Sequence, residues 1–488
     1  MKVLSVSYEV APIFKVGGLG DVAGSLPKAL AKLGVDMTLV MPDYDRIRVK
    51  KERIKETLTV WFDDKEEEVA IFKTILPNTT IPVYLLNNSH YLDDLHKPPE
   101  KHYQQFAFFS KAVSEFIHLS GNNSSYRYDI LHLHDWHTAL VPFLLKYSNA
   151  TKPIVLPKTL LTIHNFGYQA ITSGKILTKL GISAHATPVV AWDMRDHTFE
   201  YLKQGIIHAD FINTVSKTYR DEILDPRQSG KLAQIAKARE GRIVGILNGI
   251  DYDTWDPETD KYLVKNYHPK KFSILKKDKQ ILPSQTGKRI NKRAVQKAFG
   301  LSILDDIPLF TFIGRVEPTQ KGIDILMTAF DDVLTKSSIQ LAILGTGDTI
   351  WAAKLHRFVS HFSKKAAFID RFDEALAHKL YAGADFMVIP SKYEPCGLVQ
   401  MIAMRYGTIP LVRKTGGLAD TVEEGKTGLL FNDYSGKELA QVLRRAIKVY
   451  NQDQHTIDKM RQNDFGKDFS WEKSAREYLK LYKKIIRT

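Results

Sequence analysis

The chain has 488 residues, of which 44% are hydrophobic and 25% charged, and its formal net charge is +14. This composition excludes a disordered tail protein, because it supplies enough apolar side chains for a packed core. The single cysteine, Cys396, excludes an intramolecular disulfide framework and a zinc site built from several cysteines. No apolar run approaches the roughly 20 residues of a membrane span, and the polar first ten residues do not fit a signal peptide. We therefore expect a cytoplasmic protein without a membrane partner.

The first half opens with an apolar run at residues 3–6 that predicts a strand, and a glycine-rich loop follows it. Apolar residues from Leu19 to Leu33 then recur at helical spacing, and Gly34 closes that helix. A second strand at 37–41 completes a β-loop-α-β unit, the start of a doubly wound sheet. Further strands are predicted at 129–134 and 159–164, each ending in polar residues, where α/β sheets place their ligands.

The second half repeats this alternation of strands and helices, which predicts another mostly parallel sheet. Its strands are predicted at 308–314, 339–344, 367–369, 386–390 and 409–412, and its helices at 322–334, 373–384, 397–406 and from Gly416 onward. We predict an α/β protein with two Rossmann-like domains facing across a cleft. The proposed division is an N-terminal domain at 1–255, a basic linker at 256–300, a C-terminal domain at 301–470 and a final helix at 471–488.

Most of the net positive charge lies between residues 261 and 300, which hold ten Lys and two Arg against one acid, Asp278. Such a block is typical of a solvated surface or a linker. It is also compatible with a nucleic-acid patch, or with a region that attracts an anionic small molecule. No nucleic-acid-binding motif accompanies it, so we expect no nucleic-acid partner.

The loop KVGGLGD at 15–21 lies between a predicted strand and a predicted helix. Its glycines allow close approach to a ligand, its amides favour an anion, and Lys15 adds a mobile positive charge. Residues 18–23 also fit G-x-G-x-x-A, with Asp43 near the end of the second strand. A dinucleotide site, and hence a dehydrogenase, is therefore an alternative interpretation.

Three histidines, His132, His134 and His137, stand at the end of the strand predicted at 129–134. Strand alternation places His132 and His134 on one face, so a zinc site is conceivable. No thiol or carboxylate completes an obvious fourth position, and a hydrogen-bonding rim explains the cluster equally well. We expect no bound metal.

Two cations, Arg315 and Lys321, flank the loop that follows the strand at 308–314. An Arg fork and a Lys point charge at the carboxyl end of a parallel strand suit a diphosphate, although a solvated loop would carry the same residues. The small-residue turns at 345–347 and 415–417 favour the functional interpretation, because the second leads into a helix N-terminus.

The most specific segment is SKYEPCGL at 391–398, between an apolar strand and an apolar helix. It places Glu394 at the mouth of the sheet, beside the amides of Cys396 and Gly397. A carboxylate with backbone amides can hold several sugar hydroxyls. The alternatives are a helix-capping carboxylate for Glu394, and a thiol nucleophile or a small buried residue for Cys396.

Taken together, these segments resemble glycosyltransferase family 5, the bacterial glycogen synthases and plant starch synthases. The matching motifs run in family order across nearly the whole chain. They are EVAP at 9–12 with KVGGLGDV at 15–22, HDWH at 134–137, TIHN at 162–165, ILNGID at 246–251, EPCGL at 394–398, TGGLADTV at 415–422 and DFSW at 468–471. The resemblance implies the glycosyltransferase-B fold, with the helix near 471–486 crossing back to the first domain.

The resemblance also implies an activity: retaining transfer of glucose from ADP-glucose to the non-reducing end of an α-1,4-glucan, with glycogen or a malto-oligosaccharide as acceptor and no cofactor or metal. It places His164 beside the C6 hydroxyl of the glucose, and Arg315 and Lys321 on the departing diphosphate. The remaining implied contacts are Lys15 and Gly18 near phosphate, Glu394 with Cys396, Gly397 and Leu398 on the glucose, Phe372 on the adenine, and Asp135, Asn165, Asn248, Thr415 and Gly416 lining the site.

Two departures from the family pattern keep rival interpretations open. Five residues separate Arg315 from Lys321 where the family usually has four, and the segment SGKLA at 229–233 replaces a glycine-rich family motif. A UDP-glucose preference is the rival within the enzyme class. An inactive glucan-binding homologue is the rival outside it.

Overall fold

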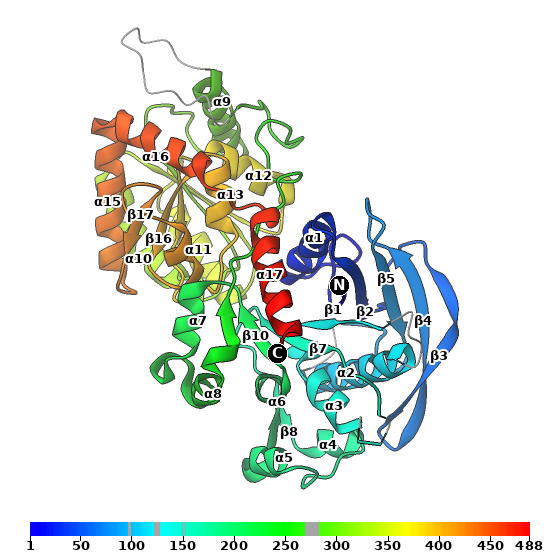
Figure 1. Cartoon of the computed structure of the whole chain (residues 1–488). Helices are drawn as coiled ribbons and strands as arrows, with labels where there is room; N and C mark the ends of the chain where they lie inside the picture. The colour runs from blue at the N-terminus through cyan, green and yellow to red at the C-terminus, as the bar shows by residue number, and fades with distance from the viewer. Residues whose placement is uncertain (96–98, 122–126, 149, 152, 269–282) are drawn as a thin grey trace. The chain divides into compact units, whose positions relative to one another are not determined.

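The protein, represented by a computed structural model that describes residues 1–95, 99–121, 127–148, 150–151, 153–268 and 283–488, forms two compact units (Figure 1). Unit 1 comprises Met1–Gly249 together with Trp471–Thr488, and unit 2 comprises Ile250–Ser470. Within the described ranges, no helix is long and apolar enough to cross a membrane.

Unit 1 is built on a nine-stranded sheet of order β11-β10-β7-β6-β1-β2-β5-β4-β3. The pairings from β11 through β5 are parallel, whereas β4 pairs antiparallel with both β5 and β3. A separate two-stranded sheet joins β8 and β9. The strands are β1 (Lys2–Val6), β2 (Asp36–Pro42), β3 (Glu52–Phe62), β4 (Lys65–Ile75), β5 (Pro82–Asn87), β6 (Ile130–His134), β7 (Lys158–Ile163), β8 (Ile171–Ser173), β9 (Thr198–Glu200), β10 (Phe211–Thr214) and β11 (Ile243–Gly245).

The helices of unit 1 include the last helix of the chain, α17, which packs against α1 (Figure 1). Its buried face, with Trp471, Tyr478 and Tyr482, joins the same apolar core as Val22 and Leu26 of α1. The helices are α1 (Gly18–Lys32), α2 (Pro99–Gly121), α3 (Val141–Ser148), α4 (Lys175–Lys179), α5 (Pro188–Asp193), α6 (Tyr201–His208), α7 (Lys217–Ile223), α8 (Pro226–Ala238) and α17 (Trp471–Ile486), with 3-10 turns η2 (Trp136–Thr138), η3 (Met194–Asp196) and η4 (Glu240–Arg242).

Unit 2 contains a six-stranded parallel sheet of order β14-β13-β12-β15-β16-β17. The strands are β12 (Leu309–Ile313), β13 (Gln340–Gly345), β14 (Ala366–Asp370), β15 (Phe386–Ile389), β16 (Ile409–Arg413) and β17 (Leu429–Phe431). The helices are α9 (Pro283–Ala298), α10 (Ile323–Lys336), α11 (Thr349–Ser360), α12 (Glu374–Gly383), α13 (Val399–Arg405), α14 (Gly416–Thr421), α15 (Gly436–Gln452) and α16 (Gln454–Gly466).

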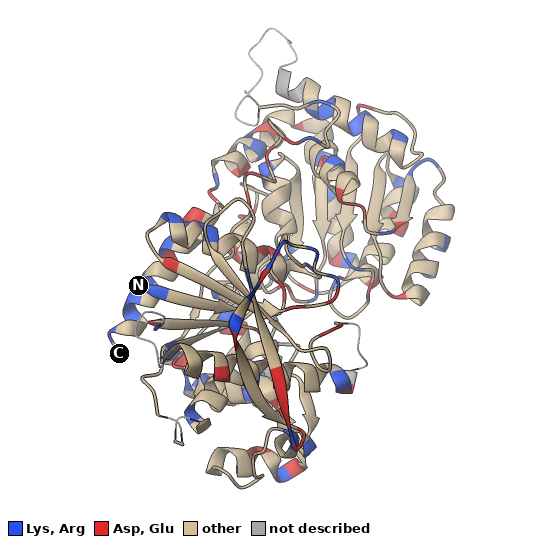
Figure 2. Cartoon of the chain, turned by 90° about the vertical axis from the view of Figure 1, so that its right-hand side faces the viewer, with Lys and Arg blue, Asp and Glu red and all other residues tan. Residues whose placement is uncertain are grey.

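The central strands of unit 2 are apolar because both faces of a parallel sheet are covered by helices. Strands β12, β13 and β15 contain no charged residue, and Figure 2 shows the charged residues on the helices and loops around them. The predicted α/β class with two Rossmann-like domains is confirmed, and every strand predicted for the second half is present.

The basic stretch proposed as a linker at 256–300 differs from that expectation. Residues 283–298 form α9, which packs on α12 inside unit 2, and the division between the units falls after Gly249 and again after Ser470. Residues 269–282, which hold several of the lysines, lie outside the described residues. Amphipathic spacing in α9 explains the difference, since Val295 of this helix, and Phe299 directly after it, turn apolar side chains into a core cluster.

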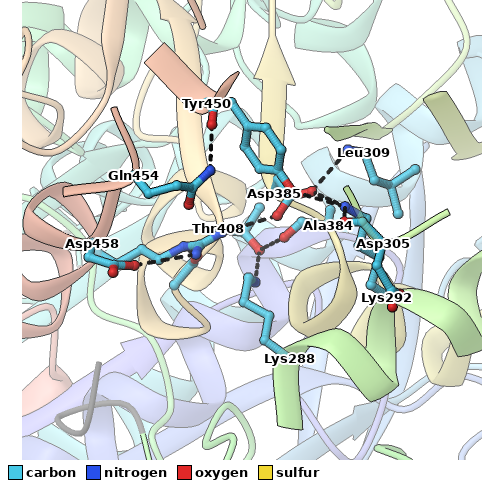
Figure 3. A network of polar contacts seen from close by, with 12 residues as sticks. Lys288, Lys292, Asp305, Leu309, Ala384, Asp385, Thr408, Tyr450, Gln454 and Asp458 are labelled. Atoms are coloured by element: carbon cyan, nitrogen blue, oxygen red, sulfur yellow. Dashed lines mark hydrogen bonds and ion pairs between the residues drawn. The ribbon is translucent and has the colours of Figure 1, made fainter. Parts of the chain in front are cut away.

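Two lysines of α9 are buried in a polar network of unit 2 (Figure 3). Nζ of Lys292 lies 2.8 Å from Oδ2 of Asp385, whose other oxygen is 3.1 Å from the Arg461 guanidinium. Nζ of Lys288 donates to Oγ1 of Thr408 at 2.8 Å, and burial lowers the pKa of this lysine. Burial pushes the pKa of Asp385 upward, but Lys292 and Arg461 outweigh burial and hold that pKa below its usual value.

Candidate active site

Asp135 connects the carboxyl ends of β6 and β7 in unit 1. Its Oδ1 accepts hydrogen bonds from the backbone amides of His164 at 2.7 Å and Asn165 at 3.4 Å. The residue has φ 58°, a conformation that Asp and Asn adopt more readily than most residues. Burial raises the pKa of Asp135 to about 7 against the opposing effect of the two amides, and the negative charge of Glu9 adds to the rise.

His164 and His134 form a hydrogen-bonded pair of imidazoles above these strand ends. Nε2 of His164 lies 3.0 Å from Nδ1 of His134, whose Nε2 is 3.2 Å from Oγ of Ser5 on β1. Burial lowers the pKa of His134 to about 3 and lowers that of His164 as well. Both rings are therefore neutral near pH 7, and the pair can accept or donate a hydrogen bond without changing charge.

The other two histidines of the cluster have structural partners. His132 bonds Tyr482 and Thr162 through its two ring nitrogens. The ring of His137 is stacked between Tyr8 and Trp136, with centroids 3.8 and 3.9 Å away. The rings of His132 and His137 thus serve as hydrogen-bonding and packing groups at the end of β6.

Glu9 organises the glycine-rich loop before α1. Its Oε2 accepts hydrogen bonds from the amide of Gly17 at 2.9 Å and from the amide of Val16. The first amides that the sequence suggested for an anion are therefore bound by a carboxylate of the protein itself, which holds the loop immediately before α1. Lys15 and Gly18 are exposed, and Nζ of Lys15 lies 2.8 Å from Oδ1 of Asp21.

Asn165 and Asn248 also belong to unit 1. Oδ1 of Asn165 accepts from the amide of Gly167 at 3.0 Å. Asn248 is 5% exposed, and its Oδ1 is buried without a hydrogen-bond partner among the described residues. A buried acceptor of this kind is expected to meet a donor in the working protein.

Asp43, on which the dinucleotide interpretation depends, is buried and hydrogen-bonded to other residues of unit 1. The residue is 1% exposed, Lys51 donates to both its carboxylate oxygens at 2.6 and 2.7 Å, and Asn87 donates to Oδ2 at 3.1 Å. Its carboxylate is therefore not presented to a ribose.

In unit 2, Lys321 and Glu394 form an ion pair. Nζ of Lys321 lies 2.7 Å from Oε2 of Glu394, and Oγ of Ser391 donates to the same oxygen at 3.0 Å. Oε1 of Glu394 has no hydrogen bond to any residue in the described ranges, so one carboxylate oxygen is fixed and the other can accept from a ligand.

Glu317 shapes the loop between Arg315 and Lys321. Its carboxylate accepts the amides of Thr319 at 2.8 Å, Gln320 at 3.1 Å and Lys321 at 3.1 Å. The exposed guanidinium of Arg315 donates to Oε1 of Gln320 at 2.8 Å. The loop that is one residue longer than the family pattern is thus a compact turn around one carboxylate.

The glycine turns of unit 2 let loops approach each other. A Cβ on Gly417 would lie 2.0 Å from the carbonyl oxygen of Cys396, and the amide of Gly417 donates to the carbonyl of Glu394 at 3.0 Å. Gly397 has φ 71°, so α13 begins at Val399, two residues later than predicted. Thr415, Gly416 and the thiol residue Cys396 are buried, and Leu398 is half-buried.

Phe372 follows β14 and is 82% exposed. An aromatic ring this exposed offers a large apolar face for stacking. The segment at 229–233, which departs from the family pattern, lies in α8, where Gly230 interrupts the helix with φ 61° and ψ −143°.

Comparisons with known proteins agree over the whole chain. Residues 2–238 match the family model of the starch synthase catalytic domain, and residues 307–448 match that of glycosyl transferases group 1. The glycogen synthase of Thermotoga maritima is 36% identical over 502 residues, covering 100% of this chain and 99% of its own. The chain belongs to the glycogen and starch synthase family. The glycogen synthase of Kosmotoga olearia is 38% identical, and the match covers 100% of this chain and 98% of that protein.

Solved structures agree with this assignment at two levels, the family in one case and the fold alone in the other. The catalytic domain of starch synthase IV from Arabidopsis thaliana, bound to ADP and acarbose, matches with a TM-score of 0.86 and 30% identity, covering 100% of this chain and 99% of that one. A sucrose-phosphate synthase from Thermosynechococcus elongatus shares the fold, with a TM-score of 0.62 at 19% identity. The family and the glycosyltransferase-B fold inferred from the sequence motifs are both confirmed.

For three residues of the site, the residue type and the position in the sequence did not predict a function. Glu9, Glu317 and Ser391 hold the glycine loop, the 315–321 loop and the Glu394 carboxylate, respectively. Glu9 lies in a motif that carried the family resemblance, and Glu317 lies between Arg315 and Lys321. Closeness in the sequence to predicted site residues was therefore the signal that could have identified them. Nothing in the sequence shows which amides each carboxylate meets.

Proposed function

We propose that this chain transfers glucose from ADP-glucose to the non-reducing end of an α-1,4-glucan, with retention of configuration at the anomeric carbon, and so elongates glycogen. The observation that carries the proposal is the Lys321–Glu394 pair with its organised loop. A cation suits the diphosphate of such a donor, and a carboxylate with one available oxygen suits its sugar hydroxyls.

The groups of unit 2 account for the donor. Arg315 and Lys321 stabilise the charge that develops on the leaving diphosphate, and no metal is needed for that role. Oε1 of Glu394 accepts hydrogen bonds from the glucose hydroxyls, and the amides of Cys396 and Gly397 donate hydrogen bonds to them. The exposed ring of Phe372 stacks on the adenine, which favours ADP-glucose over UDP-glucose because a purine offers the larger face.

The groups of unit 1 are assigned to the sugar and the phosphate. His164 is neutral and contacts the C6 hydroxyl of the glucose, while Asp135 and Asn165 shape the loop that carries it. Lys15 and Gly18 lie near phosphate, and Asn248 supplies a buried acceptor.

The bond change follows from the state of Glu394. One oxygen of this carboxylate is held by Lys321 and Ser391, which weakens it as a nucleophile. We therefore propose a front-face substitution, in which the glucan hydroxyl forms the new glycosidic bond on the side from which the diphosphate departs. The proton of the glucan hydroxyl is transferred to the oxygen of the departing diphosphate.

Two measurements test this proposal. Wild-type protein should incorporate glucose from ADP-glucose into glycogen, and Glu394→Gln should lose about 100-fold in kcat while remaining folded. A slow fluorinated donor should leave no glucosyl adduct on the protein by mass spectrometry. An adduct on Glu394 would contradict the front-face step, and an unchanged rate in Glu394→Gln would contradict the role of this residue.

A further inference from the structure

A chain of hydrogen bonds runs through the core of unit 1 between two tyrosines of α17, both fully buried. The hydroxyl of Tyr482 lies 2.7 Å from Nδ1 of His132 on β6, whose Nε2 lies 2.6 Å from Oγ1 of Thr162 on β7. Oγ1 of Thr162 bonds Oδ1 of Asn213 on β10, and Nδ2 of Asn213 lies 3.0 Å from the hydroxyl of Tyr478. The chain thus crosses three neighbouring strands.

The direction of every bond in this chain follows from counting protons. Nδ2 of Asn213 also lies 3.5 Å from the carbonyl oxygen of Thr214, which can only accept, so Oδ1 of Asn213 must accept from Thr162. Thr162 has one hydroxyl proton and gives it to Asn213, so its oxygen accepts from Nε2–H of His132. Burial lowers the pKa of His132, which leaves the ring neutral. His132 is therefore the Nε2–H tautomer, and its Nδ1 accepts from the hydroxyl of Tyr482.

The fixed ring of His132 supports the imidazole pair of the candidate site. His132 and His134 lie two residues apart on the same face of β6, with ring centroids 4.3 Å apart. His134 in turn bonds Nε2 of His164 at 3.0 Å. A continuous path of contacts therefore leads from Tyr482 through His132 and His134 to His164.

We propose that Tyr482 is a positioning residue of the glucosyl transfer: its hydroxyl donates to Nδ1 of His132 and fixes the orientation of this ring, and this ring holds the His134–His164 pair in the arrangement that meets the donor sugar. The proposal rests on the proposed function, because it takes His164 as a group that touches the donor. Tyr482 lies 350 residues from His132 along the chain, and its side chain is fully buried.

The chain offers a matched control in Tyr478, which lies on the same helix and is equally buried. Tyr482→Phe removes the hydroxyl that donates to Nδ1 of His132, and leaves the lone pair of this buried nitrogen without its partner. Tyr478→Phe removes the hydroxyl at the far end of the chain, where Nδ2 of Asn213 keeps the carbonyl of Thr214. The two variants delete the same group, but only the first removes a hydrogen bond to a histidine ring.

Two readouts in the full-length protein test the proposal. Long-range proton–nitrogen NMR of histidine-labelled protein, with the His132 signal assigned from a His132→Gln sample, should show Nε2–H for His132 in wild type and in Tyr478→Phe. Tyr482→Phe should shift the ring nitrogens of His132, His134 and His164. With ADP-glucose and glycogen, Tyr482→Phe should lose about tenfold in kcat with donor KM within twofold, and Tyr478→Phe should stay close to wild type.

The possible outcomes distinguish a positioning role of Tyr482 from an effect on the stability of the protein alone. Equal losses in the two variants, in step with equal drops in Tm, would overturn the proposal, and so would an unchanged kcat in Tyr482→Phe. The Nδ1–H form of His132 in wild type would overturn it as well. A wild-type protein with no turnover would refute the proposed function and the catalytic part of this inference, while the NMR measurement would still decide whether Tyr482 holds the rings of His132, His134 and His164.

Discussion

Nζ of Lys321 lies 2.7 Å from Oε2 of Glu394, although the two residues are 73 positions apart, and their side chains are only 20% and 10% exposed. The pair joins the group suited to a diphosphate with the group suited to a sugar. In a largely buried setting each charge depends on the other, because an unpaired buried ion is strongly destabilising.

The first prediction concerns this pair. Lys321→Ala and Glu394→Ala should each reduce kcat by at least about 100-fold. The loss in the double variant should be smaller than the product of the single losses, since each single variant leaves one buried charge unpaired. Steady-state kinetics with a thermal unfolding curve for each variant checks this. Lys336→Ala is the matched control, because it breaks an exposed pair with Asp332. Independent, multiplicative losses would contradict the coupling.

A second prediction follows from the raised pKa of Asp135, which is about 7 in the folded chain and about 4 in an unfolded one. A carboxyl whose pKa rises on folding contributes stability below about pH 4, and this contribution is lost as pH rises through about 7. Asp135→Asn keeps the oxygen and tolerates the positive φ. Its free energy of unfolding, relative to wild type, should therefore increase from pH 4 to pH 8.

The same variant should lose activity. The ionised carboxylate holds the amides of His164 and Asn165 more firmly than a neutral group does. We expect kcat/KM of wild type to fall below about pH 7, and the Asp135→Asn profile to lack this limb at a lower plateau. Chemical denaturation and initial rates across pH 5–8 provide both measurements. An identical pH profile in the variant would refute the assignment.

Glu9 gives a third prediction. Glu9→Ala removes the carboxylate that caps the amides of Val16 and Gly17, at a cost of about 1 kcal/mol in the free energy of unfolding. Amide hydrogen exchange over residues 15–20 should speed up, and the donor KM should rise. Glu52→Ala, at an exposed position on β3, serves as control. Protection of the loop at the wild-type level would show that Glu9 does not organise it.

The buried Asp385 gives a fourth prediction. Asp385→Asn leaves Lys292 and Arg461 without their carboxylate and should lower the free energy of unfolding by roughly 3 kcal/mol. The pKa of Asp385 is lowered on folding. Its contribution is therefore present above about pH 4 and is lost as pH falls through the folded value. Urea unfolding at pH 7 and pH 3 should show the gap between wild type and variant shrinking. A constant gap would contradict this account.

Much of the fold could be predicted from the sequence because buried parallel strands are apolar runs that end at glycine or polar residues. This pattern identified β1, β6, β12 and β15. It missed the β3–β4 hairpin, whose exposed faces carry many charges while alternate residues such as Leu58 and Val60 are buried. The sequence feature that could have revealed this hairpin is the Asp63-Asp64 turn, where φ is 55° and 59°.

The candidate site was predictable at the level of loops and residue types. The segments after β1, β6, β12 and β15 all carried recognisable motifs, because strand ends are where such folds place ligands. Partners distant in the chain were not predictable. The Tyr482–His132 and Lys321–Glu394 contacts depend on tertiary packing, to which local spacing gives no access.

The most direct test of the proposed function supplies purified wild-type protein with glycogen and either ADP-glucose or UDP-glucose, and measures release of each nucleoside diphosphate together with glucose incorporation. ADP release should match incorporation and exceed UDP release by at least about tenfold, and Phe372→Ala should narrow this ratio by weakening the adenine contact. Faster turnover with UDP-glucose would contradict the donor assignment. Turnover with neither donor would contradict the proposal that this chain is an active glucosyltransferase, and would favour an inactive glucan-binding homologue.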